Sequence, residues 1–137
     1  MKRQNWENYF MDITFKVAER ATCKRAKVGS ILVKDHHILT TGYNGSLPGE
    51  DHCIDVGCLI IDSHCQRCLH AEESAIVQSA KRGINIDGAT CYCTHHPCVR
   101  CLRLLIASGI SCIYYSTEYR KEDIPEEFLK IIPIIKS

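Results

Sequence analysis

The chain lacks any long apolar run and any surplus of charge of one sign. Its longest apolar stretches, such as residues 131–135, fall far short of the roughly 20 residues that a membrane-spanning helix needs. The first seven residues contain no apolar segment of the kind found in signal peptides, so we expect a cytoplasmic protein. Seventeen basic and sixteen acidic residues give a net charge of +1. Proteins that hold nucleic acid usually carry a larger basic surplus, so this balance favours a small-molecule substrate.

The composition is otherwise ordinary for a globular protein. Hydrophobic residues make up 45% of the 137 and charged residues 24%, which excludes disordered, collagen-like and coiled-coil chains. A chain of this length predicts one domain, spanning residues 1–137, with a single core that needs no disulfide bonds.

The abundant residue is cysteine, which occurs ten times. A reducing compartment disfavours a secreted, disulfide-linked protein. Cysteines at short spacings near histidines instead indicate metal ligands. We expect others, namely Cys91, Cys93 and Cys112 in predicted strands, to be buried as small apolar side chains.

The hydrophobic pattern predicts an α/β fold in which helices cover a central sheet. A cysteine-rich insertion at about residues 44–69 has a loop-like composition, and its length suggests that a metal holds it. The predicted elements are a helix at 5–21, a hairpin of strands at 28–33 and 38–43, a helix at 70–82, a strand at 89–94, a helix from Pro97 to Gly109, a strand at 111–116 and a short helix at 126–132.

Two short motifs carry the chemistry. His70-Ala71-Glu72 and Pro97-Cys98-Val99-Arg100-Cys101 both fall at predicted helix starts. Cys98 and Cys101 are one turn apart, and a helix N-terminus favours the thiolate form that binds metal. With His70 they give three zinc ligands, which leaves a fourth position open, as in catalytic zinc sites. Glu72 is then placed to carry a proton between zinc-bound water and a substrate.

The combination H-x-E…P-C-x-x-C is that of zinc nucleobase deaminases. The chain resembles the deoxycytidylate (dCMP) deaminase family within that class. The resemblance rests on residues 23–29, on Gly42-Tyr43-Asn44-Gly45, on the insertion before His70, and on residues 113–120. One departure is Glu73-Ser74, where the family often has Leu or Met and then Asn.

The resemblance implies a cytidine deaminase-like fold, a three-layer α/β/α arrangement with a central mixed sheet of about five strands. It also implies zinc-dependent hydrolysis of dCMP to dUMP and ammonia, which supplies dUMP for thymidylate synthesis in a bacterium or virus-infected cell. Activation by dCTP with Mg²⁺, inhibition by dTTP and assembly as a homo-oligomer, a hexamer in many members, are further implications. Acceptance of modified cytosine nucleotides stays open.

The resemblance also suggests substrate and effector contacts. Asn44 is expected at the sugar and the Ala71 backbone at the base, with the effector held near Gly42, Tyr43, Asn44 and Gly45. The phosphate needs cationic donors, for which the candidates are Arg25 and Arg120, with Tyr119 beside the latter. The alternatives are that Asn44 is a turn residue and that both arginines are ordinary surface residues.

A second, structural zinc is a further expectation. Some phage members of the family hold one, and Cys23, Cys53, His64 and Cys68 form a four-ligand set of the kind that closes a structural site. His52, Cys58 and Cys65 are competing ligands. His95 and His96 adjoin the active-site motif, where one could line the site or both could only position Pro97.

Two other readings remain. The first is a deaminase of another nucleoside, nucleotide or base. The second is a non-catalytic zinc module that uses the pairs Cys65/Cys68 and Cys98/Cys101 together to bind a partner; it has no use for Glu72.

Overall fold

A mixed sheet of five strands forms the centre of the molecule. The computed structural model describes residues 2–118 and 124–137, apart from the side chain of His64. Strands lie in the order β2-β1-β7-β8-β9, with β1 antiparallel to both neighbours and the last three parallel. Their bounds are Gly29–Lys34 for β1, His37–Tyr43 for β2, Thr90–His95 for β7, Cys112–Thr117 for β8 and Ile134–Lys136 for β9.

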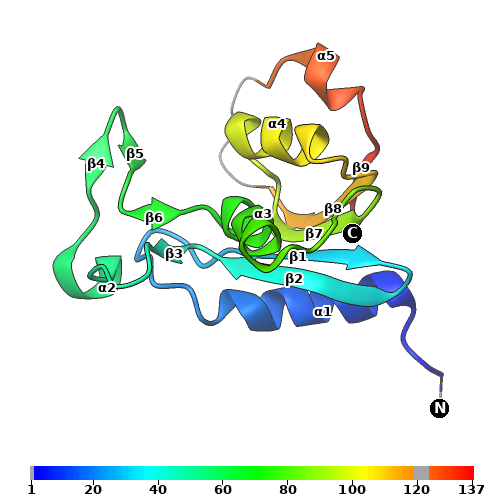
Figure 1. The fold of residues 1–137 in the computed structure, drawn as a ribbon, viewed down its shortest axis with the longest axis horizontal. Coiled ribbons are helices and arrows are strands. Elements are labelled where there is room, and N and C mark those ends of the chain that lie inside the picture. The colour runs from blue at the N-terminus through cyan, green and yellow to red at the C-terminus, as the bar shows by residue number, and fades with distance from the viewer. Residues whose placement is uncertain (1, 119–123) are drawn as a thin grey trace.

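Helices cover both faces of this sheet, which confirms the predicted three-layer α/β/α fold. Helix α1 (Trp6–Ala18) lies on one face, and α3 (Ala71–Arg82) and α4 (Val99–Ala107) lie on the other (Figure 1). The short helix α5 (Glu126–Leu129) lies in the second described range, residues 124–137. None of the helices in the described part of the chain is both long and apolar enough to cross a membrane.

The alternation of side chains along the strands produces two cores. Ile31, Val33 and Tyr92 pack with Phe10 and Met11 of α1. Leu32 and Ile113 are fully buried on the opposite face with residues of α3 and α4, and Cys91 and Cys93 lie there with them. The expectation that these two cysteines are buried in strands is confirmed; Cys112 is only half-buried.

The cysteine-rich insertion, residues 44–69, is called the arm from here on. It stands to one side of the sheet (Figure 1). Within it β3 (Gly45–Ser46) pairs with β6 (Cys68–Leu69), and β4 (Ile60–Ile61) pairs with β5 (His64–Cys65), with α2 at Cys53–Val56. Several of its apolar residues, such as Ile54 and Ile60, are about half exposed, and the buried cluster at the arm consists of the cysteines Cys23, Cys53 and Cys68.

Some predicted bounds are wrong. The first helix ends at Ala18, because the chain turns before Ala21, and the last predicted helix covers only residues 126–129. Strand β9 was not predicted, because three residues after Pro133 are too few to show a period. Pro97 precedes the N-cap Cys98 and does not lie in the first helical turn.

Candidate metal centre and cleft

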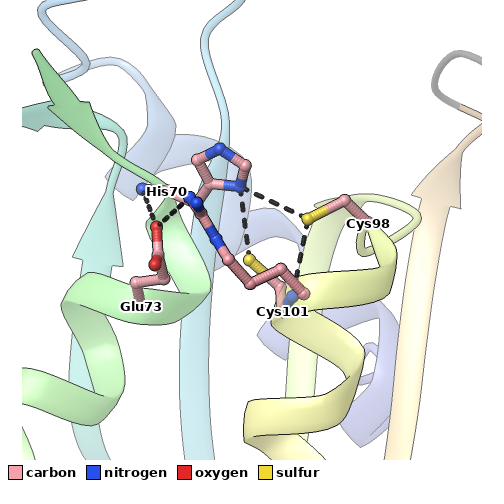
Figure 2. A network of polar contacts seen from close by, with 5 residues as sticks. His70, Glu73, Cys98 and Cys101 are labelled. Atoms are coloured by element: carbon pink, nitrogen blue, oxygen red, sulfur yellow. Dashed lines mark hydrogen bonds and ion pairs between the residues drawn. The ribbon is translucent and has the colours of Figure 1, made fainter. Parts of the chain in front are cut away.

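His70, Cys98 and Cys101 meet where α3 and α4 begin. The Nδ1 atom of His70 lies 3.5 Å from the Cys98 sulfur and 3.3 Å from the Cys101 sulfur (Figure 2). His70 and Cys98 are the N-caps of α3 and α4, and Cys101 is in the first turn of α4. All three ligand atoms lie within 4.8 Å of one another. The structure therefore brings the three predicted ligands together.

Close packing of α3 on β2 fixes the position of His70. A side chain at Gly42 would collide with the carbonyl oxygen of Ala71 and the backbone nitrogen of Ala75, so only glycine lets the helix lie this near the strand. This packing explains why position 42 is a glycine. The predicted effector role of residues 42–45 stays a prediction.

The chemistry of this donor set fits zinc. A hydrogen bond from the Cys101 thiol, assisted by His70, lowers the pKa of Cys98 to about 3, while the pKa of Cys101 is raised because it holds the shared proton. The same contact with Cys98 raises the pKa of His70. Two cysteine sulfur atoms and an imidazole are ligands that zinc prefers, and three protein ligands leave a fourth position open.

Glu72 is buried beside this centre, with 4% of its surface exposed. Burial raises the pKa of its carboxyl group, and a hydrogen bond with the Cys101 thiol opposes part of that rise. A carboxyl group whose pKa is raised holds its proton more readily than an exposed one, which suits a group that transfers protons. It is not among the three atoms grouped as metal ligands.

A cleft that is partly open to solvent leads to the centre. Eight of the predicted site residues line the cleft: Cys23, Arg25, Asn44, Cys68, His70, Ala71, Glu72 and Cys98. His95 and His96, whose roles the sequence left open, line it as well. Tyr119 and Arg120 lie outside the described residues.

The side chain of Asn44 is buried and makes two hydrogen bonds. Its side-chain amide donates to the Ala26 carbonyl at 2.7 Å, and its carbonyl oxygen accepts from the Val28 backbone at 2.8 Å. These bonds hold the segment that enters β1 against the end of β2. Arg25, in that segment, is exposed and reaches the Ser63 carbonyl of the arm at 3.5 Å. Contacts of both residues with a substrate stay predictions.

Thr94 is a residue that sequence reasoning missed. It is fully buried; its hydroxyl accepts from the Gly29 backbone at 3.1 Å and makes a 2.8 Å hydrogen bond with Nδ1 of His95. This bond orients the His95 ring at the cleft. Nothing in the sequence indicated it, because Thr94 and Gly29 meet only through the pairing of β1 with β7.

Glu73 was noted in the sequence only as a departure from a family pattern. Its Oε1 atom accepts the His70 backbone N–H at 2.9 Å and an Arg100 guanidinium N–H at 3.1 Å (Figure 2). The side chain thus connects the start of α3 with the start of α4.

A second cluster of sulfur atoms lies at the base of the arm. Cys23, Cys53 and Cys68 form one group within 4.8 Å, and Cys53, Cys58 and Cys65 form another. The Cys53 sulfur is 3.1 Å from Cys68 and 3.7 Å from Cys65, and all ten cysteines of the chain are free thiols. Three of the four predicted ligands are brought together; the side chain of the fourth, His64, lies outside the description.

The two Cys-x-x-Cys pairs do not combine. Among the described residues, no group of ligand atoms within 4.8 Å contains members of both the 65/68 pair and the 98/101 pair. A zinc module that uses the two pairs together is therefore not supported.

Residues 4–117 match the sequence model of the family described as the cytidine and deoxycytidylate deaminase zinc-binding region. The chain is 43% identical over 130 residues to ComE operon protein 2 of Bacillus subtilis (strain 168), covering 95% of this chain and 69% of that protein. It is 32% identical over 138 residues to the deoxycytidylate deaminase of Saccharomyces cerevisiae. That alignment covers 96% of this chain but 43% of the yeast protein, so the chain spans less than half of that relative's length.

Among solved structures, the fold is similar to that of the dCMP deaminase from the cyanophage S-TIM5 in complex with dCMP and dUMP. The TM-score is 0.86 and the sequence identity 31%, with the whole of both chains covered.

Proposed function

The chain belongs to the cytidine and deoxycytidylate deaminase family, and from that premise we propose that it hydrolyses dCMP to dUMP and ammonia. The observation that carries this proposal is the position of Glu72, a buried carboxyl group that lines a cleft beside His70, Cys98 and Cys101. The choice of dCMP rests on the phage enzyme that this chain resembles over its full length and on the yeast relative.

His70, Cys98 and Cys101 would hold the zinc ion. When bound, zinc lowers the pKa of a coordinated water and so supplies the nucleophile for C4 of the cytosine ring. Burial keeps Glu72 away from bulk water, so its carboxyl oxygen can take the proton that this nucleophile gives up.

Glu72 then delivers protons to the substrate. The proton from the nucleophile goes to N3 of the ring. Glu72 would then take a second proton from the hydroxyl group formed at C4 and pass it to the amino group, which leaves as ammonia. The product is dUMP, and the carboxyl group returns to its starting state. The raised pKa of Glu72, caused mainly by burial, suits a group that must both accept and donate a proton.

The remaining substrate contacts are proposals of the same kind. Arg25 is the described cation on the cleft that could bind the phosphate, with Arg120 and Tyr119 as the other candidates. The Ala71 backbone would contact the base and Asn44 the sugar, while Asn44 also holds residues 26–28 in place.

A second zinc ion at the base of the arm is part of the proposal. Cys23, Cys53 and Cys68 would supply three ligands, and Cys65, 3.7 Å from Cys53, competes with His64 for the fourth place. Burial raises the pKa of Cys53 to about 12, which favours its neutral thiol when no metal is bound, whereas a bound zinc ion would stabilise the thiolate. This ion would fasten the arm to the segment that follows α1.

Control by dCTP with Mg²⁺ and by dTTP, assembly as a hexamer and a cytoplasmic location rest on the family resemblance and the sequence, and they stay predictions.

The test is turnover by the zinc-loaded protein. We would follow loss of cytosine absorbance and release of ammonia with dCMP, deoxycytidine and dCTP as parallel substrates, and repeat the dCMP reaction with dCTP present. Turnover of dCMP alone supports the proposal. Turnover of deoxycytidine but not dCMP would assign a different deaminase, and no turnover of any of them would overturn the assignment.

A further inference from the structure

The starts of α3 and α4 are joined by a side-chain contact that the proposed reaction does not use. Glu73 lies in the first turn of α3, and its Oε1 atom accepts both the His70 backbone N–H at 2.9 Å and Arg100 at 3.1 Å. His70 is itself a candidate ligand. Arg100 lies between the other two, Cys98 and Cys101, in the first turn of α4. One carboxylate oxygen therefore contacts both ligand-bearing segments (Figure 2).

The burial of this contact distinguishes it from an ordinary surface ion pair. The Glu73 side chain is only 16% exposed and that of Arg100 is 49% exposed. Exposed pairs contribute little because water and salt screen them, whereas a shielded carboxylate that also accepts a backbone N–H is held in one geometry.

The charges at the starts of α3 and α4 also favour this contact. A carboxylate in the first turn of α3 interacts favourably with the helix dipole, but an arginine in the first turn of α4 does not. The first turn of α4 contains no acidic residue to offset Arg100. Glu73 of the neighbouring helix supplies that compensation, so Arg100 is stabilised at this position only when α3 and α4 begin side by side.

We propose that Glu73 and Arg100 are positioning residues that fix the distance between His70 and the two cysteine ligands and so set the affinity of the centre for zinc. The inference rests on the proposed zinc centre, and it assigns the pair no contact with the substrate. Groups that orient metal ligands from behind typically change metal affinity by about 10- to 100-fold when removed.

The test measures zinc affinity in the full chain, without substrate. Variants E73Q, R100M and the double variant would be compared by competition with a chromophoric chelator. E73Q keeps an oxygen that can accept the His70 N–H but loses the charge, and R100M removes only the cation. R103M is the matched control, since Arg103 is an exposed arginine of the same helix that makes no ion pair with Glu73 in the described structure. C98S identifies which of two zinc-release phases belongs to this centre.

We expect the zinc dissociation constant to rise about 10-fold in R100M and in E73Q. The dissociation constant of the double variant should equal that of either single variant, because the two residues act as a unit. R103M should match the unmodified chain. Zinc-saturated R100M should show a lower kcat with an unchanged KM. Wild-type affinity in R100M, or a double variant whose loss equals the product of the two single losses, would overturn the proposal. If the chain fails to deaminate dCMP, the proposed function falls, while the zinc measurements still decide this inference.

Discussion

The two sulfur clusters use the same ligand chemistry in different surroundings. His70, Cys98 and Cys101 sit at two helix N-termini that are packed on the sheet, with the buried carboxyl group of Glu72 beside them. The arm cluster brings together five cysteines from loops and short elements: Cys23, Cys53, Cys58, Cys65 and Cys68. No carboxylate belongs to either of its described ligand groups.

The difference shows what makes a metal centre catalytic. The first cluster offers three ligands, an acid–base group and a cleft, so a bound metal keeps a position for water. The arm cluster offers enough sulfur atoms to surround a metal completely. Apolar residues elsewhere in the arm, such as Ile54 and Ile60, are half exposed, so a metal bound by the buried cysteines would help to hold the arm in place.

The largest expected effect is that of E72Q. The amide keeps the shape of the side chain but cannot carry the proton, so kcat for dCMP should fall by about 10³-fold or more. The zinc content, measured by elemental analysis, should stay that of the unmodified chain. If E72Q turned over dCMP within tenfold of the unmodified chain, Glu72 would not be the acid–base group that distinguishes the first cluster from the arm cluster.

The next largest effect is expected for C53S. Cys53 is fully buried and belongs to both groups of the arm cluster, so its loss should release the arm metal and destabilise the arm by about 4 kcal/mol or more. Limited proteolysis should then cut first within residues 44–69. Because Cys23, Cys65 and Cys68 line the cleft, KM should rise more than kcat falls. An arm as resistant to protease as before would show that sulfur does not hold it.

A smaller effect should separate the clusters by rate of metal loss. A chelator should remove the metal from the three-ligand centre first, since an open position lets the competing ligand attack, and from the arm later. Turnover should disappear with the first equivalent of zinc released. Loss of the arm metal before turnover declines would reverse the proposed roles.

The smallest effect is expected for C112S. Cys112 is half-buried in β8 and belongs to neither cluster, so the substitution should leave zinc content and turnover unchanged and shift stability by no more than about 1 kcal/mol. This variant controls for the general effect of replacing a cysteine. A loss of zinc in C112S would show that the clusters are not confined to the residues named.

The sequence predicted the centre well because its members are local. His70 and Glu72 share one helix start, and Cys98 and Cys101 share another, so each motif fixes the relative direction of its own side chains. The periodicity of the helices and strands likewise predicted the layered fold. The three-residue strand β9 could not be predicted, because it is too short to show an alternation of apolar and polar residues and is defined only by its pairing with β8.

Contacts between distant segments could not be predicted where no sequence motif links the two residues. The Glu73–Arg100 pair spans 27 positions and depends on how closely α3 and α4 begin. The hydroxyl of Thr94 meets Gly29 across 65 positions, only because β1 and β7 are neighbours. The arm's ligand set stayed open for the same reason, since six candidate donors follow one another within residues 52–68 and spacing alone does not choose among them.

By itself the sequence determined the family of the chain and the layered fold, and it predicted three metal ligands with an acid–base partner, because periodic patterns fix the elements and the combination of two short motifs is specific to the family. Only the tertiary structure decided which cysteines meet in the arm, that Asn44 holds the entry to β1, and that one glutamate connects both ligand-bearing helices. Those contacts depend on the docking of elements far apart in the chain, and docking is set by the packing of the whole core and not by any local pattern.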